Sequence, residues 1–405
     1  MNTRASFSAA VPRLASNLLS GRLLAVLAGL AALGTLSTNI ILPAFPSMAS
    51  DLRVDTRDIG VVLSSFFLAF AIGQLFVGPL SDRWGRRALV LGGLLLFVAG
   101  SAICAWAPTL PMLVAGRVIQ ALGVCAASVL SRAIARDLFE GEALARTLAL
   151  TMVAMAAAPG FSPLLGSAME YGPGWRASFT LMGLLGVLLA LAYMVVVGET
   201  HPASRRVVAE PKVVLQGYAA LLTDVRFIRT AFAVSVILGG LYAFFAATPA
   251  ILMARMGLNA LQLGMFFAST VFVVFASGML APRWAGRWGA ARVARAGCLV
   301  ALIGALGLLA GMGGGGLAYF TLSMVFYLFG MGLVNPLGTA MALGPFNQQA
   351  GLASALLGGL QMALAGVMTT LASFAGPSPI IALGTVLTVA SVLALAALMI
   401  RDTQN

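Results

Sequence analysis

Charged residues are scarce in this chain of 405 residues, and acidic residues are the scarcest of all. Only 9% of the residues are Asp, Glu, Lys or Arg, and just 12 are acidic. A soluble domain carries about 25% charged residues, so this chain cannot cover a water-facing surface. The scarcity excludes a soluble globular protein and places the chain in a membrane.

Residues that build enzyme and metal sites are nearly absent as well. The chain has one histidine, His201, one lysine, Lys212, and three cysteines that lie apart in apolar stretches. Such a set lacks the ligand spacing of a typical metal site, and Lys212 follows a proline instead of a phosphate-binding glycine loop. We therefore expect no enzyme, no metal site and no cofactor.

Apolar residues, in contrast, make up 60% of the chain and gather in long stretches. The stretches cover residues 23–46, 59–80, 88–107, 111–131, 147–169, 177–198, 227–251, 260–282, 293–312, 317–338, 350–373 and 378–400. A membrane-spanning helix needs about 20 apolar residues, and a helix satisfies its own backbone in lipid. The sequence predicts an all-α protein with twelve transmembrane helices, a multi-pass protein of the cell inner membrane.

The basic residues show which way these helices cross. Of the 24 Lys and Arg residues, 19 lie in segments on the same side as the N-terminus, four lie on the other side, and Arg117 lies within a span. By the positive-inside rule, both termini are predicted to be cytoplasmic. The net charge of +12 therefore reflects topology, and we expect no binding to nucleic acid.

A sequence repeat divides the chain into two halves. The segment RWGRRALV at 83–90 recurs as RWGAARVA at 287–294, an offset of 204 residues. Parallel repeats of this kind occur in transporters with two six-helix halves. The predicted organisation is a cytoplasmic tail (1–22), a six-helix bundle (23–198), a cytoplasmic linker (199–225), a second six-helix bundle (226–401) and a tail (402–405).

The loop after the second span carries the most specific motif, which reads GPLSDRWGRR from residue 78 to residue 87. It combines glycines that permit close helix approach, an acid that can pair with arginine, and three arginines. The residues concerned are Gly78, Asp82, Arg83, Gly85, Arg86 and Arg87. This loop resembles the signature of the major facilitator superfamily, where it braces the two halves in the outward-facing state.

Further motifs resemble the Bcr/CflA branch of the drug:proton antiporters. They are RVIQALG at 117–123, RDLF at 136–139, YAFFAATP at 242–249, and the helix-bending set Pro159, Pro163 and Gly166. The resemblance covers nearly the whole chain. It implies a monomer in the major facilitator fold that exports a small drug-like or natural-product solute by alternating access, in exchange for protons.

The first span departs from that branch. The family usually has an acid in a run like TDMYLPALP, whereas this chain reads TNIILPAFP and has Asn39 in place of the acid. Moreover, none of the acidic residues is predicted to lie in mid-membrane, and none occurs between Asp224 and Asp402. A buried carboxylate is the usual proton carrier in such proteins. Proton coupling is therefore not expected to rest on a mid-membrane carboxylate.

Arg117 lies within the fourth span, and an ionisable residue in that position indicates a functional role. Asn39 and Arg117 are predicted at nearly the same depth, because a helix rises 1.5 Å per residue. Arg117 either contacts the substrate or ties helices together through backbone carbonyls, Asn39 and Gln120. The candidate substrate-binding residues are Asn39, Arg117, Gln120, Tyr242, Phe245, Asn335 and Gln361.

Three functions remain open from the sequence. The first is efflux of a drug-like or natural-product solute. The second is export or uptake of an anionic or metal-chelating metabolite such as a siderophore, suggested because Arg117 has no acidic partner and would make the cavity electropositive. The third is a transporter-like membrane receptor or sensor. Each predicts a small-molecule ligand within the lipid bilayer.

Overall fold

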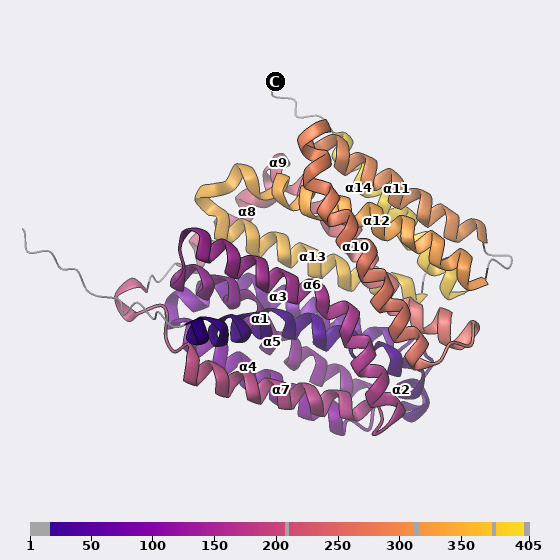
Figure 1. Ribbon diagram of the computed structural model, residues 1–405, viewed down its shortest axis with the longest axis horizontal. Helices are drawn as coiled ribbons and strands as arrows, with labels where there is room; N and C mark the ends of the chain where they lie inside the picture. Colours follow the sequence, from indigo (N-terminus) through magenta and orange to yellow (C-terminus); the bar gives the residue numbers. More distant parts are fainter. Residues whose placement is uncertain (1–16, 207–209, 312–315, 375–377, 401–405) are drawn as a thin grey trace, which may run out of the picture.

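The computed structural model describes residues 17–206, 210–311, 316–374 and 378–400, and these residues form a bundle of long helices (Figure 1). The helices are α1 (Asn17–Asn39), α2 (Phe45–Leu52), α3 (Gly60–Trp84), α4 (Arg86–Trp106), α5 (Leu110–Leu138), α6 (Gly141–Tyr171), α7 (Trp175–Val196), α8 (Pro211–Thr223), α9 (Val225–Thr248), α10 (Ala260–Trp288), α11 (Ala290–Ala310), α12 (Gly316–Leu343), α13 (Ala350–Phe374) and α14 (Pro379–Met399). Within these described ranges, twelve helical segments are long and apolar enough to cross a membrane. The predicted all-α fold class with twelve spans is therefore confirmed.

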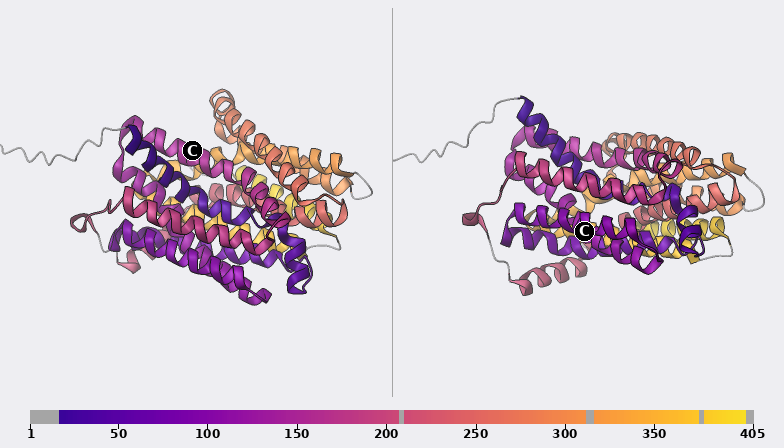
Figure 2. Two further views of the ribbon diagram at one scale, coloured as in Figure 1. Left: turned by 60° about the horizontal axis from the view of Figure 1, so that its bottom comes forward. Right: turned by 90° about the horizontal axis from the view of Figure 1, so that it is seen from below.

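The two halves have matching internal arrangements. In the first half α4 packs on α5 and α7, and α1 packs on α6; in the second half α11 packs on α12 and α14, and α9 packs on α13. Figure 2 shows the long helices of both halves running along the same direction. The internal repeat seen in the sequence thus corresponds to a repeat of helix packing.

Repeat-related glycines explain why the halves pack alike. Gly85 and Gly289 both have positive φ, 91° and 84°, and each separates two consecutive spans at the same place in its half. Gly100 and Gly304 allow close helix contact, because an added Cβ would lie 2.5 Å from the backbone nitrogen of Gln120 or Tyr327, respectively. Both pairs are 204 residues apart, so the offset found in the sequence is preserved in three dimensions.

The halves meet along two seams. In one seam α3 packs along α13, and in the other α6 packs along α10. The second seam is tight near Ser167, whose Oγ lies 2.7 Å from the carbonyl oxygen of Ala260. From there α6 and α10 diverge toward the end of the molecule where α3 and α10 terminate (Figure 1). We call that end the arginine-rich end, since it carries the segments 83–87 and 283–295, and we call the other the opposite end.

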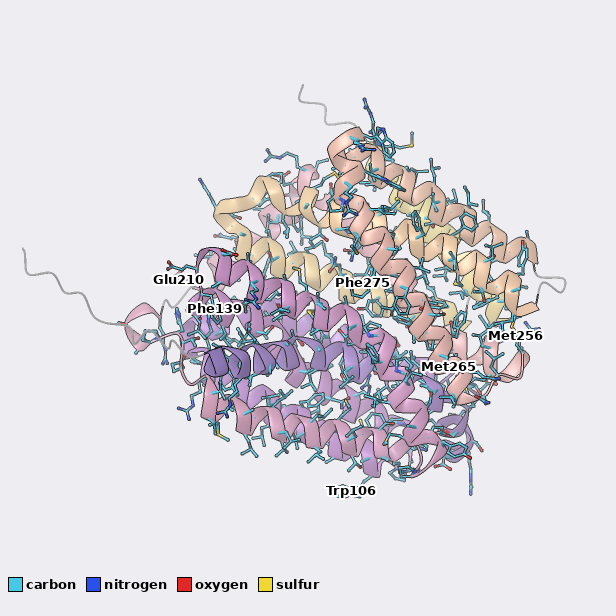
Figure 3. All side chains as sticks on the ribbon, in the orientation of Figure 1. Trp106, Phe139, Glu210, Met256, Met265 and Phe275 are labelled. Carbon is cyan, nitrogen blue, oxygen red and sulfur yellow. The ribbon has the colours of Figure 1, made fainter. Side chains whose placement is uncertain are left out.

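The surface of the bundle is apolar, as expected for contact with lipid. Trp106 is 79% exposed and Met265 is 52% exposed, and Figure 3 shows both side chains projecting from the outside of the bundle. The first apolar stretch was predicted to continue as a helix to residue 46, but α1 ends at Asn39. A 3₁₀ turn with Pro43 follows, and proline cannot donate the backbone hydrogen bond that would continue the helix.

The linker contains α8, which lies against the second half and contacts the first. Tyr218 of α8 donates a hydrogen bond of 2.8 Å to the carbonyl oxygen of Leu75 in α3. Burial raises the pKa of Tyr218 to about 12, so its hydroxyl stays a donor at neutral pH. The remaining predicted tail residues, 1–16 and 402–405, lie outside the described residues.

Candidate functional site

Arg117 of α5 is the largest fully buried side chain in the described protein. Its Nε donates to the carbonyl oxygen of Val62 in α3 at 3.4 Å, and its Nη1 donates to the carbonyl oxygen of Ser37 in α1 at 3.2 Å. The guanidinium also lies 4.2 Å from the ring centroid of Phe66, a cation–π distance. One arginine therefore joins three helices of the first half.

Gln120 extends this contact set to a fourth helix. Its Oε1 accepts from Nη1 of Arg117 at 2.5 Å, and its Nε2 donates to Oγ of Ser101 in α4 at 2.8 Å. The i, i+3 spacing places both side chains on one face of α5. Nη2 of Arg117 is buried and has no hydrogen-bond partner among the described residues. Among the described residues, one donor nitrogen of the buried guanidinium is thus left without an acceptor.

Asn39 lies beside this network without joining it. Its side-chain amide donates to the carbonyl oxygen of Thr35 at 2.8 Å and to Oγ1 of Thr38 at 3.2 Å. Arg117 instead bonds the carbonyl of Ser37, two residues before Asn39. The two residues do lie at similar depth, but the connection between their helices runs through the backbone.

An aromatic group lies where α3 of the first half faces α9 of the second. The rings of Phe67 and Tyr242 have centroids 4.5 Å apart, and Tyr242 lies 6.2 Å from Phe245. Phe245 in turn contacts Phe267 of α10 at 5.4 Å. Phe67 was not among the sequence candidates, because nothing in the sequence pairs it with a residue so distant along the chain.

The remaining polar candidates lie on helices of the second half. Asn335 of α12 and Gln361 of α13 are half-buried, and no hydrogen bond among the described residues joins either side chain to the Arg117 network. Gln74, which is buried, packs directly on Gly358 across the α3–α13 seam. The structure therefore separates the candidates into a buried group in the first half and a group nearer the seams.

Among the described residues, the carboxylates lie near the ends of the helices or in the segments between them. Asp58 lines a cavity of about 260 Å³ between α3, α5 and α13 at the opposite end, together with Ser64, Thr370 and Ser373. The Oε2 atom of Glu170, near the end of α6, is buried without a hydrogen-bond partner among the described residues. Neither acid contacts Arg117 through a hydrogen bond or ion pair.

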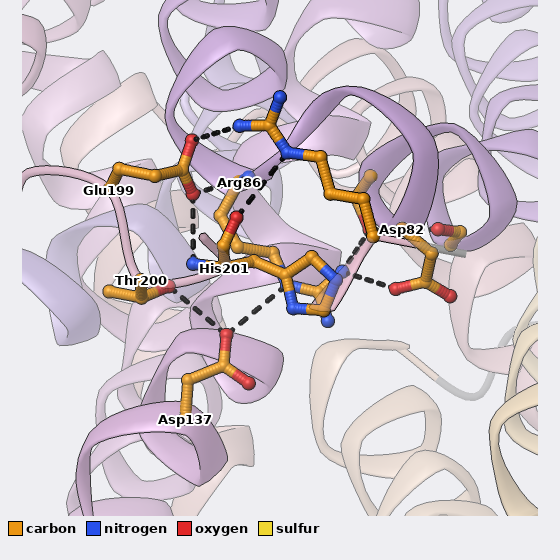
Figure 4. A network of polar contacts seen from close by, with 9 residues as sticks. Asp82, Arg86, Asp137, Glu199, Thr200 and His201 are labelled. Atoms are coloured by element: carbon orange, nitrogen blue, oxygen red, sulfur yellow. Dashed lines mark hydrogen bonds and ion pairs between the residues drawn. The ribbon is translucent and has the colours of Figure 1, made fainter. Parts of the chain in front are cut away.

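Arg86 organises the signature loop at the arginine-rich end. Its Nη1 lies 2.7 Å from Oδ1 of Asp82 and also contacts Oγ of Ser81, while its Nε lies 3.2 Å from Oδ2 of Asp137. The backbone nitrogen of Arg86 donates to Oε1 of Glu199 at 3.0 Å (Figure 4). The predicted pairing of Asp82 thus involves Arg86, whereas Arg83 and Arg87 are exposed.

The linker completes this network. Thr200 Oγ1 donates to Oδ2 of Asp137 at 3.0 Å, and Arg206 pairs with Glu199 at 3.4 Å. Gly85 must be small here, because an added Cβ would meet the side chains of Glu199 and Arg206. Among the described residues, the network joins the first half to the linker and forms no hydrogen bond or ion pair with the second half, which matches the divergence of α6 and α10 at this end.

A matched pair of variants tests this network. Replacing Asp137 by Asn removes the charge that faces Nε of Arg86, and we expect transport about five-fold slower, the effect of losing roughly 1 kcal/mol from a partly exposed ion pair. The measurement is the initial transport rate at equal protein abundance. Glu142→Gln removes an exposed carboxylate from the same end and should leave the rate unchanged; equal rates in both variants would contradict the assignment.

The residues predicted to bend the fifth span lie in α6, on the helix that forms the α6–α10 seam. Pro159 and Pro163 are inside α6, where each removes a backbone donor. Gly166 fits against the carbonyl of Ile40, which a Cβ would overlap. The small residues therefore let α6 approach the turn after α1 while Ser167 contacts α10.

The sequence matches known proteins over most of its length. Residues 27–377 match the profile of the Major Facilitator Superfamily. The chain is 32% identical to the uncharacterized MFS-type transporter YdgK of Bacillus subtilis (strain 168), over 84% of this chain and 86% of that protein. It is 29% identical to Multidrug resistance protein D of Escherichia coli (strain K12), over 87% and 88% of the two chains.

A third relative and a solved structure agree with this assignment. The chain is 26% identical to the bicyclomycin resistance protein homolog of Haemophilus influenzae (strain ATCC 51907 / DSM 11121 / KW20 / Rd), over 82% of this chain and 84% of that protein. The crystal structure of a D-xylose-proton symporter superposes with a TM-score of 0.72 at 17% identity, over 94% of this chain and 97% of that one. These matches confirm the family resemblance predicted from the motifs and the expectation that the protein is not an enzyme. The chain belongs to the Major Facilitator Superfamily and is a multi-pass membrane transporter.

Proposed function

We propose that this transporter exports small drug-like or natural-product solutes across the inner membrane by alternating access. The single observation that carries the proposal is the arrangement of α6 and α10, which contact each other at Ser167 and Ala260 and diverge toward the arginine-rich end. Relatives named for multidrug and bicyclomycin resistance support the substrate class. In the predicted topology, the end at which α6 and α10 diverge faces the cytoplasm, where an exporter collects its substrate.

The proposed binding surface is the aromatic group between α3 and α9. Tyr242 is half-buried, whereas Phe67, which it contacts across the halves, is only 2% exposed. A flat apolar solute is therefore proposed to contact Tyr242 first and to reach Phe67 as the two rings separate. Asn335 and Gln361 are the polar groups proposed to orient it. Ligand sites of this kind are mostly apolar with a few polar groups, which favours neutral lipophilic solutes.

Arg117 is proposed as a positioning residue in this conformation. Its guanidinium donates hydrogen bonds to Val62, Ser37 and Gln120, and the side chain is fully buried. An anionic or metal-chelating substrate was suggested because the charge of Arg117 was expected to be exposed in the cavity. The burial of Arg117 removes that reason. Saturable solute flux in liposomes would distinguish transport from a receptor or sensor role.

Proteoliposomes with an imposed pH gradient test the proposed efflux and its coupling. We expect export of a lipophilic antibiotic from the side that carries the arginine-rich end, at a rate that rises with an opposing proton gradient. Because no described mid-span position holds a carboxylate, the proton is expected to be carried by an acid at a helix end, such as Asp58 or Glu170, or by the substrate. Flux that ignores the gradient would overturn antiport, and binding without flux would overturn transport.

Asn39→Asp should increase the dependence of transport on the proton gradient or shift the preference toward cationic solutes. The substitution adds a carboxylate where side chain 39 is 1% exposed, at the end of α1 and two residues after Ser37, whose carbonyl contacts Arg117. The measurement compares the ratio of rates with and without a gradient for wild type and variant. Asp51→Asn, which changes an exposed acid at the opposite end, serves as the control; an unchanged ratio in Asn39→Asp would contradict the prediction.

A further inference from the structure

The arginine-rich end of the second half carries a surplus of positive charge. Arg283, Arg287, Arg292 and Arg295 lie on α10 and α11, and the sequence has no acidic residue between Asp224 and Asp402. Among the described residues, none of these four arginines forms an ion pair. The first half differs, because Arg86 there pairs with both Asp82 and Asp137. Any anionic partner for these four arginines must therefore come from outside the described part of the chain.

A groove of about 460 Å³ lies at the same end, between α10, α11 and α12. Trp284 and Trp288 of α10 form one wall with ring centroids 5.8 Å apart, and Phe329 of α12 lies 6.2 Å from Trp284. Val293 and Leu333 are buried at 3% and 2% exposure and line its base. The groove is thus apolar and aromatic along its length.

One charged side chain lines this groove. Arg292 is exposed and lies at the start of α11, just after the end of α10 at Trp288. Tryptophan and arginine side chains favour the interface between hydrocarbon and headgroups, and basic pockets between transmembrane helices bind acidic lipid headgroups. An apolar channel beneath one cation has the shape and charge of a phospholipid with an acyl chain and an anionic headgroup.

The repeat shows that this combination is specific to the second half. At the offset of 204 residues, Trp288 corresponds to Trp84, but Trp284 corresponds to Leu80 and Arg292 to Ala88. The exposed fractions of Trp84 and Trp288 are nearly equal, at 52% and 53%. Position 84 therefore provides an internal comparison that has the same ring exposure without the second tryptophan or the arginine.

We propose that the groove between α10, α11 and α12 binds an acidic phospholipid of the adjoining leaflet, with its phosphate at Arg292 and an acyl chain along Trp284, Trp288 and Phe329. The neighbouring arginines supply a positive field that favours an anionic headgroup over a zwitterionic one. The site is separate from the aromatic group between α3 and α9, so it does not depend on the identity of the transported solute.

Native mass spectrometry of the full-length protein in detergent tests this proposal. The protein is incubated with equal amounts of phosphatidylglycerol and phosphatidylcholine, and the retained lipids are counted. We expect preferential retention of phosphatidylglycerol, and about a five-fold smaller preference in Arg292→Gln, because one basic group near an anionic headgroup contributes roughly that factor. Arg292→Lys keeps the charge and should keep the preference.

Two controls make the result specific to the groove. Arg146→Gln removes an exposed arginine from the same end of the first half and should leave lipid retention unchanged. Trp288→Ala should reduce retention of phosphatidylglycerol, whereas Trp84→Ala should not. Equal retention of the two lipids by wild type, or equal losses in Arg146→Gln and Arg292→Gln, would overturn the proposal. If Arg292→Gln does not fold, as judged by thermal unfolding, Arg292→Lys and the tryptophan pair decide the outcome.

Discussion

Replacing Arg117 by alanine is expected to abolish transport and to lower the thermal stability of the protein. The side chain is fully buried and joins α5 to the carbonyls of Val62 in α3 and Ser37 in α1. Its removal also leaves Oε1 of Gln120 without the donor that it contacts at 2.5 Å. Each buried acceptor left without a donor costs about 1–3 kcal/mol, so the packing of three helices is weakened together.

The comparison with lysine separates the charge of Arg117 from its geometry. An ammonium group has one nitrogen, whereas the planar guanidinium reaches several acceptors in fixed directions. We therefore expect Arg117→Lys to recover part of the thermal stability and little of the transport. Arg255→Ala, which removes an exposed arginine, should change neither quantity.

Thermal unfolding and transport must be measured on the same preparations. A coupled loss supports the role of Arg117 in tying helices together, because a direct substrate contact alone would lower transport without lowering the unfolding temperature. Full transport by Arg117→Ala at an unchanged unfolding temperature would contradict both roles. The added solute should stabilise wild type, and loss of that stabilisation alone would indicate that Arg117 contacts the substrate.

The predictable parts of the fold depend on the lengths of the apolar stretches and on the internal sequence repeat. The twelve spans follow from apolar length, and the repeat between residues 83–90 and 287–294 predicted the equivalent breaks at Gly85 and Gly289. The depth of Arg117 relative to α1 was also predictable, because the rise of a helix is constant. The acceptor that Arg117 contacts in α1, the carbonyl of Ser37, was not predictable. It depends on the rotation of the helix about its axis and on the rotamer of the Arg117 side chain.

Contacts between segments that are distant along the chain could not be predicted from the sequence, for a different reason. The RDLF motif identified Asp137, but not that Arg86 and Thr200 would both bond it. Phe67 and Tyr242 are on different halves, and the contact between their tilted rings depends on how the halves are placed. Helix-forming patterns are local, whereas these contacts depend on the packing of already formed helices.

A reversible cross-link across the α6–α10 seam should stop transport completely. A Cβ placed at Gly264 would lie 2.9 Å from Oγ of Ser167, so cysteines at both positions place two thiol groups within reach of the geometry that a disulfide requires. The bond would hold the halves together at the opposite end. Alternating access requires that end to separate, so no cycle could be completed.

The control is a cross-link of similar geometry inside one half. A Cβ at Gly34 of α1 would lie 3.0 Å from Oγ of Ser128 in α5, and both helices belong to the first half, so the cysteine pair Gly34→Cys and Ser128→Cys should form a bond without blocking transport. The native cysteines, Cys104, Cys125 and Cys298, are buried and free, which leaves the introduced pairs as the sites of oxidation.

Transport is measured before oxidation, after oxidation and after reduction in proteoliposomes that contain either cysteine pair. We expect Ser167→Cys with Gly264→Cys to be inactive only while oxidised, because the reduced pair allows the seam to open. Activity of that pair in the fully oxidised state would show that the seam at Ser167 stays closed throughout the cycle. The opening would then have to occur along α3 and α13, where Gly60 contacts Ser373 at the same end, and the rocking of two rigid halves would have to be abandoned.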